Sequence, residues 1–136
     1  MLNYFFVFIR PVIEYCCVVY HPLLTVCQSN ELERMQKQAV KLAFGWEKDY
    51  KTICAEKGIQ TMKARREAYI DKFVQKTVNS PRFGEEWYPL RDPTGYNIRD
   101  RRPFRETNAR TQRYYNSPLS FLRRRANDLA FVPEED

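Results

Sequence analysis

Apolar residues recur every three or four positions along much of the chain, which is the spacing of helices that bury one face. The pattern predicts a first helix over residues 4–20 that is kinked at Pro11 and apolar on nearly every side, so we expect burial all round. A second helix follows Asn30, which forms an N-terminal capping pattern with Glu33, and stops at Gly45.

Three further helices are expected. One covers residues 49–58, opening on an aspartate and ending at a glycine, and the next covers residues 61–78. The last covers residues 117–130, with Ser117 as the capping residue and Pro118 at the first helical position. The predicted fold class is therefore mainly α, a small helical domain of about four to five helices.

A long segment without any sustained periodicity lies before the last helix. It is broken by prolines, namely Pro81, Pro89, Pro93 and Pro103. We therefore divide the chain into a helical domain (1–81), an irregular arm rich in arginine and aromatic residues (82–116), and a C-terminal helix with an acidic tail (117–136). An irregular stretch of this length is expected to be functional, disordered or held by a partner.

The distribution of charge is more informative than the net charge of +6. Residues 82–125 carry eleven basic side chains, all of them arginines, against five acidic ones, and eight aromatic residues lie among them. Residues 126–136 carry four acidic side chains and no basic one. Arginine forks onto phosphate and stacks on planar rings, whereas lysine is a hydrated point charge. The arm therefore favours a nucleic-acid surface over a merely solvated one.

Other classes of site find little support in the sequence. There is one histidine, His21, and the four cysteines form no Cys-x-x-Cys pair, so we predict no metal and no cofactor. We interpret the cysteines as reduced thiols of an intracellular protein of the cytoplasm or nucleus, with the pair Cys16 and Cys17 in the core. The apolar run over residues 2–9 is far shorter than the roughly 20 residues that span a membrane, so no stable membrane insertion is expected.

Four short patterns follow one another along the chain. They are Arg10-Pro11 with Glu14-Tyr15, then Leu32-Glu33 with Gln36 and Ala39, then Gly58-Ile59 with Arg65-Arg66, and finally Ala109-Arg110-Thr111 with Arg113-Tyr114, Asn116-Ser117, Phe121 and Asn127. Together, and in this order, they resemble the reverse transcriptases of LINE-type (non-LTR) retrotransposons of the jockey group. The chain departs from the family pattern at Tyr20 and Ala126, where the family usually has tryptophan.

The resemblance implies a location downstream of the polymerase palm, in the thumb and the region that follows it. The family's catalytic aromatic-Ala-Asp-Asp turn lies upstream of that region, and this sequence contains no Asp-Asp pair. Because two-metal nucleotide transfer needs clustered carboxylates, we expect no enzymatic activity from this chain. The implied partners are RNA or an RNA–DNA template–primer, and the polymerase palm if the chain is part of a longer protein.

Ten residues are candidates for contacting nucleic acid: Arg34, Lys37, Lys41, Arg99, Arg101, Arg102, Arg110, Arg113, Tyr114 and Arg124. The first three share one side of the second helix, and a solvated face explains them as well as a helix that tracks a duplex. The cluster of Arg110, Arg113, Tyr114 and Tyr115 has the strongest case, because guanidinium groups fork onto phosphates and tyrosine rings stack on bases. Residues 123–125 are consecutive arginines that fan around their helix, so at least two should meet solvent or phosphate.

Two rival functions stay open. In the first, the chain is a small helical scaffold that docks on a partner protein through its apolar first helix. In the second, it is a peripheral membrane protein that uses that helix together with basic residues. Arg10, Pro11 and Glu14 argue against the membrane. We interpret Arg10 and Glu14 as a simple ion pair at the rim of the core, and His21 as the maker of a structural hydrogen bond.

Overall fold

The computed structural model describes residues 2–47, 49–91 and 102–130, and it is mainly helical, as predicted. The described residues form no β-strand. Their helical segments outnumber the four to five expected, because the first predicted helix is divided and short helices interrupt the segment that was expected to be irregular.

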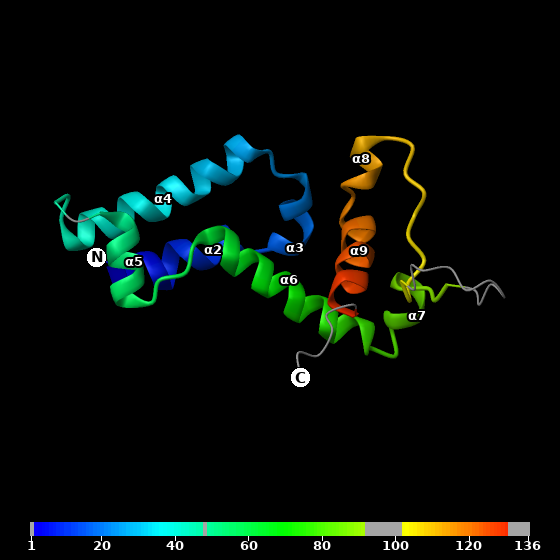
Figure 1. Ribbon diagram of the computed structural model, residues 1–136. Coiled ribbons are helices and arrows are strands. Elements are labelled where there is room, and N and C mark those ends of the chain that lie inside the picture. Colours follow the sequence, from blue (N-terminus) through cyan, green and yellow to red (C-terminus); the bar gives the residue numbers. More distant parts are fainter. Residues whose placement is uncertain (1, 48, 92–101, 131–136) are drawn as a thin grey trace. The chain divides into compact units, whose positions relative to one another are not determined.

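Packing divides the chain into two compact units, Met1–Tyr69 (unit 1) and Ile70–Asp136 (unit 2). The helix α6, Met62–Val78, runs through the division, so it contributes its first turns to unit 1 and its last turns to unit 2 (Figure 1). The domain boundaries that we placed at residues 81 and 116 stay predictions.

Unit 1 consists of short helical segments followed by longer helices. In chain order these are α1 (Leu2–Tyr4), a π-helix (Phe5–Ile9), α2 (Arg10–Glu14), α3 (Cys17–Tyr20), a 3-10 turn (His21–Leu23), α4 (Val26–Phe44), α5 (Tyr50–Lys57) and the start of α6.

The helix predicted over residues 4–20 is continuous only as far as Glu14. Around Pro11 the helix departs from α geometry, since a π-helical segment, Phe5–Ile9, runs directly into α2. The helix breaks later, at Tyr15, which is extended, and at Cys16, whose φ of 55° lies in the left-handed region. The kink at Pro11 stays a prediction.

The helix α4 starts earlier than the sequence pattern indicated. Its capping residue is Thr25 rather than Asn30, and Thr25 and Gln28 form a reciprocal capping box. The Gln28 backbone N–H donates to Thr25 Oγ1 at 3.3 Å, and the Thr25 backbone N–H donates to Gln28 Oε1 at 3.0 Å. The predicted end at Gly45 is confirmed, since this residue adopts a φ of 94° that favours glycine.

The core of unit 1 forms where α4 meets α5. Val40, Tyr50 and Ile53 are buried there, and the half-buried Cys54 and Ile59 pack against them. Full burial of an aliphatic side chain stabilises a fold by about 1.5–3 kcal/mol, so this cluster is a main source of the stability of unit 1.

Unit 2 contains the second half of α6, α7 (Gly84–Trp87), α8 (Gln112–Tyr115) and α9 (Pro118–Ala130). Its buried apolar side chains come from α6, from the residue after α7 and from α9, namely Ile70, Val74, Tyr88, Leu122 and Ala126. Gly84 is needed for close packing, because a Cβ atom there would lie 2.6 Å from the backbone oxygen of Val78.

The described part of the arm is more ordered than predicted. Besides α7 and α8, it contains an isolated antiparallel bridge between Leu90 and Phe104. The side chain of Asn127, which is 1% exposed on α9, holds the arm by accepting from Phe104 N at 2.9 Å and donating to Phe104 O at 3.1 Å. The last landmark of the resemblance thus ends in a residue that fixes the arm to α9.

Candidate functional sites

A buried ion network joins the first helix of unit 1 to the start of α6. The Arg10 and Glu14 side chains are 10% and 9% exposed, and Arg10 Nε lies 3.4 Å from Glu14 Oε1. Arg65 donates to both carboxylate oxygens of Glu14, at 2.6 Å from Nε and 3.0 Å from Nη2. The hydrogen bond to Glu14 raises the pKa of Arg65, whereas burial and the like charge of Arg65 lower the pKa of Arg10. The predicted pair at the rim of the core is therefore a buried network of three charges.

Amide groups satisfy the inner end of this network. Arg10 Nη2 donates to Gln36 Oε1 at 2.7 Å and to the backbone oxygen of Gln60 at 3.1 Å. Gln36 has no exposed surface, and its Nε2 donates in turn to the Tyr50 hydroxyl at 2.8 Å and to the Gln60 oxygen at 3.0 Å. The network therefore fixes the turn before α6 and also links α2 to α4.

The network ends on Glu33, a residue of the second landmark that the sequence also suggested as part of a helix cap. The Tyr50 hydroxyl donates to Glu33 Oε1 at 2.9 Å, and the backbone N–H of Met62 donates to Glu33 Oε2 at 2.9 Å. Burial raises the pKa of Tyr50 above its ordinary value, so this hydroxyl keeps its proton. Glu33 thus holds α5 and the first turn of α6 together.

A second arginine of α6 is also buried. Arg66 has no exposed surface, and it donates to two neutral groups, Ser29 Oγ at 2.9 Å and His21 Nδ1 at 3.4 Å. The bond to His21 agrees with the structural role expected for that histidine. Both arginines of the third landmark therefore lie in the interior or at its edge.

The first helix buries its charged side chains and exposes several apolar ones, which is the reverse of an ordinary surface helix. Its two charged residues, Arg10 and Glu14, point inward, while Tyr4, Phe8 and Val12 are 62%, 60% and 74% exposed. The expectation that this helix is buried all round is therefore wrong. An outward face without charge is typical of a surface that another molecule covers.

The cysteines are divided between the interior and the surface. Cys17 is buried, and burial raises the pKa of its thiol, but Cys16 and Cys27 are exposed. Of the predicted core pair, only Cys17 lies in the core.

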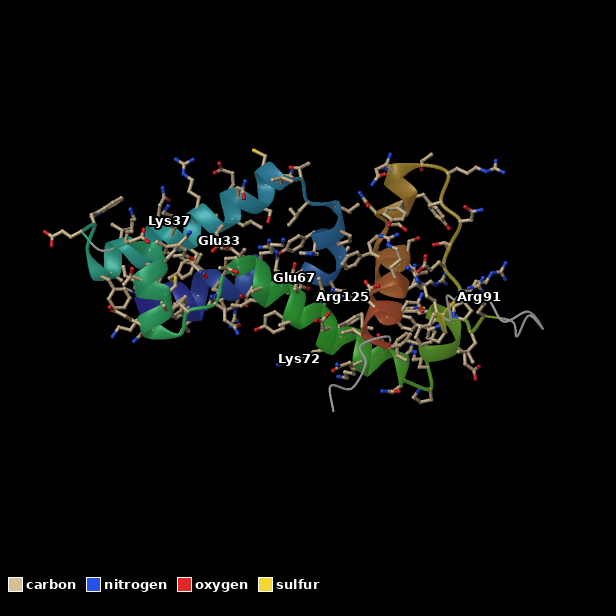
Figure 2. The ribbon with its side chains drawn as sticks, in the orientation of Figure 1. Glu33, Lys37, Glu67, Lys72, Arg91 and Arg125 are labelled. Carbon is tan, nitrogen blue, oxygen red and sulfur yellow. The ribbon has the colours of Figure 1, made fainter. Side chains whose placement is uncertain are left out.

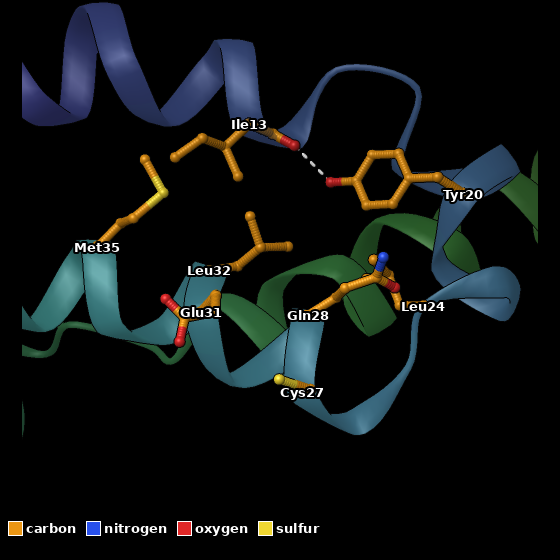
Figure 3. Close-up of a pocket in the computed structure, with 8 residues that line it drawn as sticks. All are labelled: Ile13, Tyr20, Leu24, Cys27, Gln28, Glu31, Leu32 and Met35. Carbon is orange, nitrogen blue, oxygen red and sulfur yellow. Dashed lines mark hydrogen bonds between the residues drawn. The ribbon is translucent and has the colours of Figure 1, made fainter.

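An apolar groove of about 570 Å³ lies in unit 1 between the first helix and α4. Ile13, Leu24, Leu32 and Met35 line it, and the Tyr20 hydroxyl closes one end by donating to the Ile13 oxygen (Figure 3). Because its lining is almost entirely apolar, the groove suits an apolar side chain better than a charged metabolite.

No three His, Cys, Asp or Glu side chains within the described ranges are placed to hold a metal ion. No single helix in those ranges is long and apolar enough to cross a membrane. The segments Phe5–Glu14 and Cys17–Leu23 have the required length and composition only when taken together, with a bend of 46° between them.

The three basic candidates of α4 differ in their surroundings. Arg34 lies 3.5 Å from Glu31 in an exposed pair, and Lys41 lies 5.3 Å from the ring centroid of Trp46. Lys37 is exposed and has no ion-pair partner in the described part of the chain (Figure 2). An exposed pair such as that of Arg34 contributes little to stability, so Arg34 and Lys37 are available to a ligand, whereas Lys41 is half-buried.

The strongest candidates gather on and beside α8 in unit 2. Thr111 caps this short helix by accepting from the backbone N–H of Tyr114 at 3.3 Å. Arg110 and Arg113 are exposed, and the Tyr114 side chain is 51% exposed. None of these three side chains makes a hydrogen bond, ion pair or ring contact with another described residue.

The three arginines of α9 are used within the fold. Arg123 donates to the backbone oxygen of Trp87 at 2.6 Å, and Arg125 donates to both carboxylate oxygens of Asp71. Arg124 donates to the Tyr115 oxygen at 2.7 Å, and its guanidinium carbon lies 3.5 Å from the centroid of that ring. All three are half-buried, so each keeps part of its surface in contact with solvent, but their guanidinium groups are bonded within the fold.

The remaining candidates do not add to the α8 group. Arg102 lies 2.7 Å from Glu106 in an i,i+4 ion pair. Arg99 and Arg101 lie outside the described residues. The ten candidates therefore fall into an α4 group in unit 1 and an α8 group in unit 2.

No known protein family, no curated protein and no solved structure matches the chain. The relation to LINE-type reverse transcriptases therefore stays a proposal.

Proposed function

We propose that this chain is the non-catalytic thumb and post-thumb part of a LINE-type reverse transcriptase, and that it binds RNA or an RNA–DNA template–primer. The observation that carries the binding proposal is the state of Arg110, Arg113 and Tyr114. These side chains are exposed and unengaged, while the arginines of α9 in the same unit are bonded internally.

The chemistry of these three residues fits a single strand of any sequence. A guanidinium group donates two parallel hydrogen bonds to a phosphate, and an exposed tyrosine ring offers a face on which a base stacks. Neither contact reads the edge of a base, so the binding is sequence-tolerant. The cations of α4 supply a second, purely electrostatic contact.

The placement of the landmarks supports the family proposal. Arg10, Glu14, Gln36 and Arg65 come from three landmarks, and Arg65 lies 51 positions after Glu14, yet they form one hydrogen-bonded network. A family signature is expected at positions on which the fold depends. Because the chain lacks the Asp-Asp turn, we propose binding alone and no catalysis.

The test is a titration of labelled single-stranded RNA at several salt concentrations. The double variant Arg110→Ala/Arg113→Ala should bind more weakly, and each lost phosphate contact should flatten the log–log salt slope by about 0.7 to 0.9. The matched control is Lys72→Ala/Lys76→Ala, which removes the same charge from exposed positions of α6. Equal weakening by both variants would mean that only net charge matters, and would reject the α8 surface.

Tyr114→Ala separates stacking from charge in the same assay. It should weaken binding by roughly 1–3 kcal/mol without changing the salt slope, because stacking releases no counterions. Arg34→Ala and Lys37→Ala should weaken duplex binding more than single-strand binding if α4 follows a duplex. If the affinity of Tyr114→Ala for RNA is unchanged, base stacking is rejected and only the phosphate contacts of the proposal remain.

A second candidate function, docking on a protein through the first helix, is favoured by the outward apolar face of that helix. It uses none of the residues proposed to bind nucleic acid, so both functions are compatible. A hydrophobic dye should bind this face in a dilute solution of the chain, where no other protein covers it. The dye should not bind Phe8→Glu. Equal dye binding by both proteins would reject this function.

A further inference from the structure

The outward face of the first helix is large for an uncovered surface. Four of its apolar side chains, and that of Tyr15 directly after it, are at least 60% exposed; the four are Tyr4, Val7, Phe8 and Val12. With about 200 Å² for a large aromatic side chain and less for a valine, these residues present roughly 600 Å² of mostly apolar surface. The largest apolar patch on a typical monomer is smaller or comparable, and the standard protein interface buries about 800 Å² on each partner.

The face carries no charge, and this limits what covers it. The only charged side chains of residues 2–15 are Arg10 and Glu14, and both are turned into the network with Arg65. A helix that lies on a membrane surface normally displays lysine or arginine beside its apolar face, which adds attraction to anionic lipids. The first helix displays neither, so a membrane is the weaker choice.

A second copy of the chain fits the face for two reasons. An uncharged face avoids the like-charge repulsion that two chains of net charge +6 would meet elsewhere on their surfaces. A two-fold interface brings each residue against its symmetry mate or a partner at mirrored spacing. With Phe8 at the axis of an antiparallel pair, Tyr4 of one copy faces Val12 of the other, so a large side chain meets a small one.

We propose that two copies of this chain associate through the outward face of the first helix, Tyr4, Val7, Phe8, Val12 and Tyr15, in an antiparallel, two-fold arrangement. The proposal rests on the docking function above and names its partner. Two copies would bury about 1,200 Å² in total, which is the lower end of the range for specific interfaces, and the nucleic-acid residues of α4 and α8 take no part in it.

The test is sedimentation equilibrium over a wide concentration range. The wild-type chain should have twice the monomer mass, and Phe8→Glu should raise the dimer dissociation constant at least a hundredfold, because it buries two like charges at the axis. The control is Val26→Glu, which places the same charge on a residue of α4 that is 79% exposed, and it should stay dimeric. Helix content by circular dichroism and affinity for RNA should be unchanged in both variants.

A second measurement uses the wild-type chain alone, so it does not depend on the folding of any variant. Hydroxyl-radical labelling of Tyr4, Phe8 and Tyr15 should fall as the protein concentration rises, while labelling of Tyr114 should stay constant. A chain that is monomeric throughout overturns the dimer, as does a dimer in which these three side chains stay labelled.

The outcomes also separate this proposal from the docking function. A monomer whose outward face binds the hydrophobic dye rejects the second copy and leaves docking on another protein in place. A monomer that binds no dye rejects both. A monomer that floats with vesicles of neutral phospholipid, while Phe8→Glu does not, rejects the second copy in favour of a membrane.

Discussion

The two units each contain an arginine that grips a carboxylate with the same geometry. In unit 1, Arg65 meets Glu14 at 2.6 and 3.0 Å, and in unit 2, Arg125 meets Asp71 at 2.6 and 3.0 Å. The surroundings differ, because the Glu14 side chain is 9% exposed and also faces Arg10, whereas the Asp71 side chain is 27% exposed. The two ion pairs therefore have the same distances but should contribute differently to stability. The pair of unit 1 lies in the interior, whereas the pair of unit 2 lies at the edge of the core.

The largest expected effect tests this contrast directly. Glu14→Gln should lower the free energy of unfolding by about 3–5 kcal/mol, because it leaves Arg10 and Arg65 as uncompensated like charges in a buried site. Asp71→Asn should lower it by about 1 kcal/mol or less, because water screens the partly exposed pair. Urea denaturation of both variants measures the difference.

The control for this pair of variants is Glu67→Gln, which makes the same chemical change on α6. Glu67 lies 3.9 Å from Lys63 in an exposed pair, so the loss should be at most about 0.5 kcal/mol. Equal losses for Glu14→Gln and Asp71→Asn would mean that burial does not set the strength of these pairs.

A smaller effect is expected for the residue that holds the arm of unit 2. Asn127→Ala should lower the free energy of unfolding by about 1–3 kcal/mol, because it strands the N–H and C=O groups of Phe104. The exposed Asn79, which donates only to the Gln75 oxygen, is the matched control, and its change to alanine should cost about 0.5 kcal/mol.

Hydrogen exchange gives the local readout of this prediction. The Phe104 and Arg105 amides should exchange faster in Asn127→Ala, while the amides of α4 keep their protection. Uniform acceleration across the molecule would show that the asparagine supports the fold as a whole and not the arm in particular.

The smallest effect concerns alkaline pH. Burial raises the pKa of Tyr50 in unit 1 and of Tyr88 in unit 2, so the folded chain holds both protons more tightly than the unfolded chain. Their contribution to stability is fully present below the ordinary tyrosine pKa of about 10 and is lost as pH rises through the raised values.

Denaturation measured at several pH values above 10 tests this sign. Tyr50→Phe should flatten the decline in stability the most and Tyr88→Phe less, while Tyr114→Phe, at an exposed position, should leave it unchanged. A stability that rises with pH in the wild-type chain would contradict the prediction.

The sequence predicts the longer helices well, because their boundaries depend on local signals. Gly45 and Gly58 end α4 and α5, and α9 begins at Pro118, as expected. The start of α4 is misplaced because both Asn30 and Thr25 suit a cap, and only the backbone geometry chooses between them. The break at Cys16 carries no glycine or asparagine signal, since a cysteine rarely adopts a left-handed backbone.

The buried polar residues left a signal that periodicity alone misreads. Gln36 lies four positions from Leu32 and from Val40, and Arg66 lies four positions from Met62 and from Ile70. A polar residue in the middle of an apolar stripe indicates a buried hydrogen-bonding partner. Which residue supplies that partner depends on tertiary packing, so the network and the inverted first helix were not predictable from helical spacing.

The continuity of α6 determines how the chain can be dissected in the laboratory. Arg65 and Arg66 serve unit 1, and Asp71 serves unit 2 from the same helix, with the division between them at Tyr69. Cleaving or truncating the chain at that division replaces one cooperative helix by two short helical ends that fray. Expression fragments should therefore overlap, one ending after Val78 and the other beginning before Met62, so that each keeps the whole of α6.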